Sequence, residues 1–331
     1  MSTATAASTQ ALVQAILAQH QGVFAPTGLV TNLVTDGVTE AISAPSALGE
    51  TPSEPLHETW YSAALQACTA LGFIATDAHT LARAWMHQSQ RLGHFDASCW
   101  PCDARDFGVQ GRHRSDAFAP CPQHLGLYAV LPDAAWVGRM ARAGVPTVQL
   151  RCKSEDAATI AHEVRAAVAA VRGTGALLFI NDHWREAMQA GAYGVHLGQE
   201  DLDALPAAAL AELRASGLRL GVSTHGYAEM LRADAVAPSY IALGAVFPTT
   251  LKKMATAPQG VARLAAYVRL MQSYPLVAIG GIGAAQFGEI LRTGVGSIAV
   301  VRALVQAREP EQAAQELLTL MAQGEGARPP G

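Results

Sequence analysis

Basic residues are missing from the first quarter of this chain, and long apolar runs are missing throughout. No Lys or Arg precedes Arg83, which excludes the basic start of a secretory signal and the arginines of a mitochondrial transit peptide. No run approaches the roughly eighteen apolar residues that a membrane span needs. We therefore expect a cytoplasmic protein without a membrane partner.

Charge and aromatic content are also low. Charged residues make up 15% of the 331 residues and aromatic residues 6%, whereas hydrophobic residues make up 50%. This is the composition of a globular protein with a sizeable core, in one large domain or two smaller ones. The net charge of −4 and the pI of about 6.2 give no basic surface for a nucleic-acid partner.

Cysteine is too sparse and too scattered for a disulfide framework. The five cysteines include one C-W-P-C motif, Cys99 to Cys102, and no second CxxC follows it. The pair could be a redox motif, or half of a zinc site with His113 and Cys121. We favour two incidental thiols beside a turn, because no βαβ pattern surrounds the motif.

The residues before position 120 predict a mainly helical accessory region with a linker. Helical patterns occupy 10–19 and 57–71, and a further one begins with Asp77 as its cap and ends at Gly93. Residues 44–55 indicate a linker, and 96–123 a connector rich in Asp, Arg, His, Pro and Gly. We expect an N-terminal region of residues 1–120 and a second domain of residues 121–325.

After Leu125, short apolar runs alternate with alanine-rich helical runs. Strands are predicted at 125–131, 147–151, 176–181, 194–197, 219–223, 240–247, 276–280 and 297–301. Helices are predicted at 134–143, 156–171, 184–190, 207–215, 227–233, 261–273, 285–293 and near 311–320. Eight such β/α units in some 200 residues predict a (β/α)₈ TIM barrel of parallel strands. A doubly wound open sheet is the alternative, but nothing marks the switch point that it needs.

Polar residues gather where the predicted strands end. In a TIM barrel, this is the face that carries the chemistry. Only three lysines occur, against twenty arginines, and all of them follow strands: Lys153, Lys252 and Lys253. Asp182 and Asp201 follow two neighbouring strands. Two carboxylates facing cations suit Mg²⁺ together with a diphosphate. Taken singly, Asp182 would be interpreted as an N-cap for the next helix and Asp201 as a turn residue.

Two further features lie at the same face. Gly280, Gly281 and Gly283 follow the seventh strand, where backbone N–H groups can bind a phosphate. His196 and His225 end the fourth and fifth strands. They could transfer protons or contact substrate, but we favour hydrogen-bonded wall residues.

Six stretches, in this order, resemble the thiamine phosphate synthase family: QLRCK, FINDHWREAMQAGAYGVHLGQEDL, LGVSTH, ALGAVFPTTLKK, VAIGGI and IAVVRAL. They span about residues 125–305. The resemblance implies a transferase of thiamine biosynthesis that couples hydroxymethylpyrimidine diphosphate to thiazole phosphate and releases diphosphate. It implies Mg²⁺ as cofactor and small molecules as partners, and it leaves a homo-oligomer open.

The resemblance also implies a role for each matched residue. The pyrimidine diphosphate would be held by Gln149, Arg151, Lys153, Asn181 and Lys252, with Ser223 on the pyrimidine. Mg²⁺ would be bound by Asp182 and Asp201. The thiazole phosphate would be held by Thr249, Thr250, Gly281 and the backbone at Val301 and Arg302. Arg151, Lys153 and Lys252 would stabilise the departing diphosphate in a dissociative substitution.

The chain departs from the family pattern at one position of the sixth strand end. The usual T-x-T-K-K has its second Thr replaced by Leu251, so one hydroxyl contact to the thiazole phosphate has no matching residue here. Either backbone groups compensate for it, or the affinity for that phosphate is weaker. A thiazole tautomerase-like isomerase and a non-catalytic thiamine-phosphate-binding protein of the same fold are the alternatives. The retained Lys153, Asp182, Asp201 and Lys252 argue against the isomerase. No Gly-rich ATP loop precedes residue 120, so no kinase activity is assigned there.

Overall fold

The computed structural model describes residues 8–24, 56–249 and 257–326. They fall into two compact units, divided between Pro101 and Cys102. The division lies earlier than the position near residue 120 that composition suggests. None of the helices in the described ranges is both long and apolar enough to cross a lipid bilayer.

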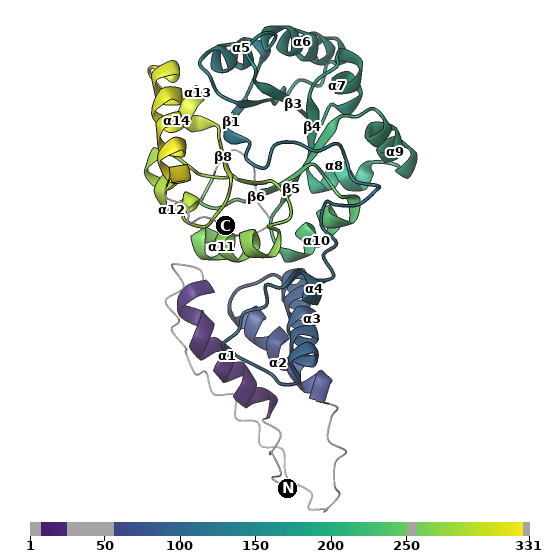
Figure 1. Ribbon diagram of the computed structural model, residues 1–331, viewed down its shortest axis with the longest axis vertical. Coiled ribbons are helices and arrows are strands. Elements are labelled where there is room, and N and C mark those ends of the chain that lie inside the picture. The colour runs from purple at the N-terminus through teal and green to yellow at the C-terminus, as the bar shows by residue number, and fades with distance from the viewer. Residues whose placement is uncertain (1–7, 25–55, 250–256, 327–331) are drawn as a thin grey trace, which may run out of the picture. The chain divides into compact units, whose positions relative to one another are not determined.

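The first unit is helical, as its sequence pattern predicts. It contains α1 (Thr9–Phe24), α2 (Leu56–Ala70) and α3 (Ala75–Leu92), and α2 packs against both α1 and α3 (Figure 1). Gly93 ends α3 in the left-handed region, with φ of 79°, which glycine adopts without strain. The predicted cap is wrong, because Ile74 is the N-cap of α3 and Asp77 is buried within its first turn.

Aromatic rings fill the core of this unit. Trp85 is fully buried, and its ring lies edge-on to Trp100 at 5.4 Å and stacks on Phe95 at 5.8 Å between centroids. Phe24 packs on Trp100 at 4.2 Å. The segment after α3 is therefore held on the helices by ring packing, supported by the indole N–H of Trp85, which donates to the carbonyl of Asp96.

The second unit is a closed barrel of eight parallel strands in sequential order, with helices around the strands (Figure 1). The TIM-barrel prediction is confirmed. The strands are β1 (Gly126–Leu131), β2 (Thr147–Leu150), β3 (Leu177–Asn181), β4 (Gly194–Leu197), β5 (Arg219–Thr224), β6 (Tyr240–Leu243), β7 (Leu276–Ala278) and β8 (Ser297–Val300).

The intervening helices match the predicted ones closely. They are α5 (Ala134–Arg142), α6 (Ala157–Ala170), α7 (Trp184–Ala190), α9 (Ala207–Ala215), α10 (Tyr227–Val236), α11 (Gly260–Leu270), η1 (Ala284–Gln286), α12 (Phe287–Leu291) and α14 (Pro310–Gly326). Three short helices were not predicted: α4 (Ala104–Phe107), α8 (Gln199–Ala204) and α13 (Arg302–Val305). The last two follow β4 and β8 directly, so they carry polar residues at the face where the site forms.

Much of the predicted connector belongs to the barrel unit. The backbone N–H groups of Gln110 and Gly111 donate to the carboxylate of Asp234 at 3.0 and 2.9 Å. The hydroxyl of Ser239 donates to the carbonyl of Ala119. Because Ser239 immediately precedes β6, this segment lies at the amino-terminal end of the barrel, opposite the face where the strands end.

Alternation along the strands decides which side chains enter the barrel. Tyr128 and Val130 of β1 both belong to the interior core, as do Tyr240 and Ala242 of β6. Phe179 of β3 lies against the two tyrosine rings, at 6.0 and 5.1 Å between centroids. This apolar layer forms a floor on which residues nearer the strand ends are placed.

Candidate active site

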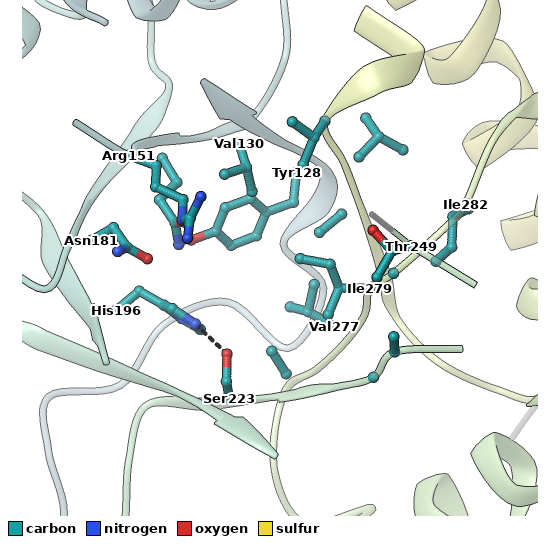
Figure 2. Close-up of a pocket in the computed structure, with 18 of the residues that line it drawn as sticks. Tyr128, Val130, Arg151, Asn181, His196, Ser223, Thr249, Val277, Ile279 and Ile282 are labelled. Atoms are coloured by element: carbon teal, nitrogen blue, oxygen red, sulfur yellow. Dashed lines mark hydrogen bonds between the residues drawn. The ribbon is translucent and has the colours of Figure 1, made fainter. Parts of the chain in front are cut away.

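A cavity of about 970 Å³ opens at the carboxyl ends of the barrel strands. Figure 2 shows side chains from several strands turned into it, among them Arg151, Asn181, His196 and Ser223. The cavity is lined by eleven of the thirteen predicted site residues: Gln149, Arg151, Lys153, Asn181, Asp182, Asp201, Ser223, Thr249, Gly281, Val301 and Arg302. Thr250 and Lys252, with the neighbouring Leu251, lie outside the described residues.

The charged side chains of the cavity, as far as the structure describes them, lie mostly over β2 to β4. Arg151 and Lys153 follow β2, Asp182 follows β3, and Glu200 and Asp201 lie on α8 after β4. Glu200 was not among the predicted site residues. Neighbouring strands of a parallel barrel end at the same rim, so residues from distant parts of the sequence meet there.

Asp182 and Asp201 lie close enough to influence each other's ionisation. The pKa of Asp182 is raised from 3.8 to about 6, first by partial desolvation of its carboxyl group and then by the charge and hydrogen bond of Asp201. Arg151 and His183 act in the opposite direction. Asp182 as a whole residue is exposed at the cavity mouth, but its carboxyl group lies close to that of Asp201. When both groups are ionised they repel each other, and a bound cation would relieve this repulsion.

Asp182 is not the helix cap that its sequence position allowed, whereas Asp201 caps the start of α8 from its first turn. His183 is the N-cap of α7, and Asp182 has a positive φ of 64°, a conformation that Asp tolerates better than most residues. One carboxylate oxygen of Asp201 accepts a hydrogen bond from the backbone N–H of Gly198 at 3.2 Å. That bond leaves further carboxylate lone pairs for a ligand.

The donor set suits Mg²⁺ held jointly with a substrate. In the described part of the chain, no group of three or more His, Cys, Asp or Glu side chains is arranged to hold a metal by itself. Mg²⁺ is usually bound by one or two carboxylates, with phosphate and water oxygens completing its shell. The paired carboxyl groups of Asp182 and Asp201 meet that requirement.

The part of the cavity over β6 to β8 is different. It is lined by Thr249, Gly281, Gly283, Val301 and Arg302. Gly281 has a φ of 67°, and a Cβ there would come within 2.6 Å of the carbonyl of Pro248. Glycine therefore lets the loop after β7 lie directly against the chain after β6, beside Thr249.

An apolar wall separates these two regions. Figure 2 shows Val130, Val277 and Ile279 around the middle of the cavity, with Ile282 near Thr249. Val130 and Val277 are buried. Such a wall would accept flat heterocycles and keep water from their reacting atoms.

The two histidines of the cavity have different partners. His225 is bonded to Glu229, whose carboxylate lies 2.7 Å from Nδ1 and also accepts the backbone N–H of His225. His196 is buried, with Nε2 2.7 Å from the hydroxyl of Ser223 and Nδ1 2.7 Å from the hydroxyl of Tyr240. Both are hydrogen-bonded members of the wall, as expected.

Sequence reasoning missed the residues beneath Ser223. Tyr128 and Tyr240 are mid-strand and look like ordinary core residues, yet both line the cavity. Their hydroxyl groups lie 2.8 Å apart, and the amide of Gln149 donates to Tyr128 at 3.0 Å. The available signal was the strand alternation, which turns both tyrosines to the same side as Val130 and Ala242.

None of the five cysteines forms a disulfide bond. Cys99 is exposed and Cys102 is partly exposed. Cys121 is buried, and its thiol donates to the carbonyl of Ser239. Burial raises the pKa of Cys121 to about 11, so it is a neutral packing residue at neutral pH.

A parallel (β/α)₈ barrel whose rim carries paired carboxylates, cations and a glycine loop belongs to the class of TIM-barrel enzymes that handle phosphorylated substrates. Residues 127–304 match the model of the thiamine monophosphate synthase family. The match covers more than half of the chain, which therefore belongs to this family.

Individual relatives agree with the family match. A thiamine-phosphate synthase of Neisseria meningitidis serogroup B is 55% identical over 194 residues, which cover 59% of this chain and 93% of the relative. One from Cronobacter sakazakii is 52% identical over 208 residues, covering 63% and 98%. The solved thiamine phosphate pyrophosphorylase of Pyrococcus furiosus superposes with a TM-score of 0.54 at 28% identity, covering 60% of this chain and 96% of that one.

Proposed function

We propose that this protein is a thiamine-phosphate synthase. It would join 4-amino-2-methyl-5-hydroxymethylpyrimidine diphosphate to 4-methyl-5-(2-phosphooxyethyl)thiazole, giving thiamine phosphate and diphosphate. The observation that carries the proposal is one cavity that gathers Arg151, Lys153, Asp182 and Asp201 at one end and a glycine loop at the other. The names of the relatives support the same activity.

The two ends of the cavity suit the two anionic groups of these substrates. We assign the diphosphate to the region over β2 to β4, where Gln149, Arg151, Lys153 and Asn181 line the same cavity as the paired carboxyl groups. Lys252 is assigned to the same diphosphate from its sequence position. The thiazole phosphate is assigned to Thr249, Thr250, Gly281 and the backbone at Val301 and Arg302.

The reaction breaks one bond and forms one. The C–O bond between the pyrimidine methylene and the diphosphate breaks, and its electron pair leaves with the diphosphate. The lone pair of the thiazole nitrogen then forms a C–N bond with that methylene carbon. No proton has to be removed from this nitrogen, so a general base is not required.

The residues of the chain act through charge and position. The guanidinium of Arg151 and the ammonium of Lys153 stabilise the charge that develops on the departing oxygen. Asp182 and Asp201 would hold Mg²⁺, which when bound supplies further positive charge to the diphosphate. The apolar wall at Val130, Val277 and Ile279 limits access of water, which would otherwise capture the pyrimidine cation. Holding the two rings together replaces an encounter in solution.

A turnover assay with both substrates and Mg²⁺ tests the proposal. We expect thiamine phosphate to form with wild-type protein and kcat/KM to fall by about 10²–10³-fold in Asp182→Ala, as for the loss of one group that stabilises a transition-state charge. Asp203→Ala is the matched control, since Asp203 is an exposed acid of α8, ion-paired with Arg232, outside the cavity lining. It should retain wild-type kinetics.

Other outcomes would select another function. Isomerisation of the thiazole without Mg²⁺ or the pyrimidine substrate would favour the tautomerase-like activity. Binding of thiamine phosphate without turnover would favour a non-catalytic binding protein. Near-wild-type rates in Asp182→Ala would refute the assignment of the carboxylates.

A further inference from the structure

A continuous chain of hydrogen bonds crosses the floor of the cavity. It runs from the amide of Gln149 to the hydroxyl of Tyr128 (3.0 Å), then to Tyr240 (2.8 Å), to His196 Nδ1 (2.7 Å), and from His196 Nε2 to Ser223 (2.7 Å). Figure 2 shows its last link as a dashed line. These residues come from five different strands, so only the closed barrel brings them together.

Proton counting gives this chain a direction. Both phenols keep their protons, because burial raises the pKa of Tyr128 and of Tyr240 above the ordinary value of 10.0. Tyr128 already accepts the amide proton of Gln149, so its own proton is available for Tyr240. If Tyr240 donated to Tyr128 instead, the Tyr128 proton would be left in the core without an acceptor among the described residues, which is unfavourable.

The direction decides the state of His196. With its oxygen accepting from Tyr128, Tyr240 donates its single proton to Nδ1 of His196. The neutral imidazole then carries its proton on Nε2. That N–H donates to one lone pair of the Ser223 hydroxyl, whose own proton is then directed to another acceptor.

We propose that Tyr128, Tyr240 and His196 are positioning residues that make Ser223 a hydrogen-bond donor to a ring nitrogen of the pyrimidine substrate. This rests on the proposed function. A ring nitrogen of an aminopyrimidine is an acceptor, whereas its exocyclic amine is a donor. A Ser hydroxyl that donates therefore recognises the ring nitrogen and holds the ring in one orientation.

Packing keeps the chain in place. Gly221 of β5 is paired in register with Tyr240, and a Cβ at that position would overlap the phenol ring. The ring of Tyr240 also stacks on His196 at 5.6 Å, with an interplanar angle of 24°, and meets Phe179 edge-on at 5.1 Å. These contacts hold the phenol ring beside His196, so its hydroxyl is in position before substrate binds.

Tyr240→Phe is the direct test, because it keeps the ring and removes the proton given to His196. We expect KM for the pyrimidine diphosphate to rise and kcat/KM to fall by about tenfold, with KM for the thiazole phosphate unchanged. Tyr274→Phe is the control. Tyr274 is equally buried, precedes β7 at the amino-terminal end of the barrel, and donates its hydroxyl proton to Asp234. It should match wild-type kinetics at a comparable loss of thermal stability.

A spectroscopic measurement tests the proton positions directly. In ¹⁵N-histidine spectra of the full-length wild-type protein, the resonances of His196 are assigned as those that disappear in His196→Gln. We expect them to show a neutral ring that is protonated on Nε2, with Nδ1 as a hydrogen-bond acceptor. In Tyr240→Phe the Nδ1 resonance should move toward that of an unbonded ring nitrogen. Protonation on Nδ1 in wild type would overturn the proposal, and this measurement on wild type does not depend on how well Tyr240→Phe folds.

The two proposals fail in different ways. Wild-type protein that makes no thiamine phosphate would refute the proposed function, while the NMR measurement would still decide the direction of the chain. Normal turnover by wild type together with unchanged kinetic constants in a folded Tyr240→Phe would refute the positioning role alone.

Discussion

Each of the two units buries a histidine, and the comparison separates packing from function. In the helical unit, His20 is buried with Nε2 2.9 Å from the carbonyl of Ala97, and its ring meets Trp100 at 5.0 Å. Burial lowers its pKa. In the barrel, His196 is similarly buried, but its second partner is Ser223 at the cavity wall.

Burial and hydrogen bonding alone therefore do not mark a functional histidine. The bond of His20 runs to a backbone carbonyl within an aromatic core, so it secures the segment after α3. The bond of His196 runs to a side chain that faces a cavity, so it can act on a ligand. The helical unit uses aromatic packing for cohesion, whereas the barrel accepts buried polar groups in order to shape a site.

The largest expected effect lies in the helical unit. Trp85→Ala removes a fully buried ring and should destabilise this unit by about 3–5 kcal/mol. Hydrogen exchange should rise across α1 to α3 while the barrel strands stay protected. Trp60→Ala, at a half-buried ring of the same unit, should have a smaller effect. Parallel loss of protection in the barrel would contradict the separation of the two units.

The next effect lies in the barrel. Arg151→Ala removes a guanidinium from the cavity and should lower kcat/KM by about 10²–10³-fold, with little change in stability, because the charge is needed chiefly in the transition state. Steady-state kinetics and thermal denaturation measure the two quantities. Arg165→Ala, on the exposed side of α6, is the control. A loss of stability without a loss of rate would give Arg151 a structural role.

A smaller effect concerns pH. The pKa of Asp182 is raised from 3.8 to about 6, so the folded protein binds this proton more tightly than the unfolded chain does. The free energy of unfolding should therefore fall as pH rises from about 4 to about 6, and the deficit should persist above that range. Asp182→Asn should remove this dependence.

Without Mg²⁺ at pH 7, the Asn variant should be more stable than wild type by about 1 kcal/mol or less, because solvent screens the exposed part of the carboxyl group. Asn also tolerates the positive φ at this position. Denaturant unfolding at pH 4.5 and pH 7, compared with Asp203→Asn, measures the difference. Equal stability of Asp182→Asn and wild type at both pH values would contradict the repulsion between Asp182 and Asp201.

The smallest expected effect is that of removing the helical unit. Deletion of residues 1–101 should change kcat/KM by no more than about twofold, because every described residue of the cavity lies in the barrel unit and a rigid barrel face suffices to place a site. Kinetics and sedimentation of the truncated protein measure the result. A large loss of rate would show that the helical unit contributes to catalysis or to assembly.

Most of the fold was predictable because its signals are local. The strand and helix bounds follow from apolar runs, caps and glycines, and the predicted barrel is confirmed. The misses have local reasons as well. β6 and β7 end at Leu243 and Ala278, earlier than predicted. After β7, Gly280 has a φ of 104°, which lies outside the extended region of a strand. α8 was not predicted because its six residues, three of them acidic, show no apolar period.

The candidate site was predictable at its rim and not at its floor. Asp182, Asp201 and Lys153 follow strands, and strand ends share one face of a barrel. Tyr128 and Tyr240 are 112 residues apart, and each alone reads as core. Their role depends on a hydrogen bond between them, which no periodicity records.

By itself, the sequence determined the alternating elements, the parallel barrel and the set of polar residues at the strand ends, because these depend on spacing along the chain. Only the tertiary structure decided that Asp182 shares its space with Asp201, that the segment after Pro101 belongs to the barrel unit, and that the chain of hydrogen bonds runs toward Ser223. The physical reason is that charge repulsion and hydrogen bonding act over a few ångströms in space, whatever the separation along the chain.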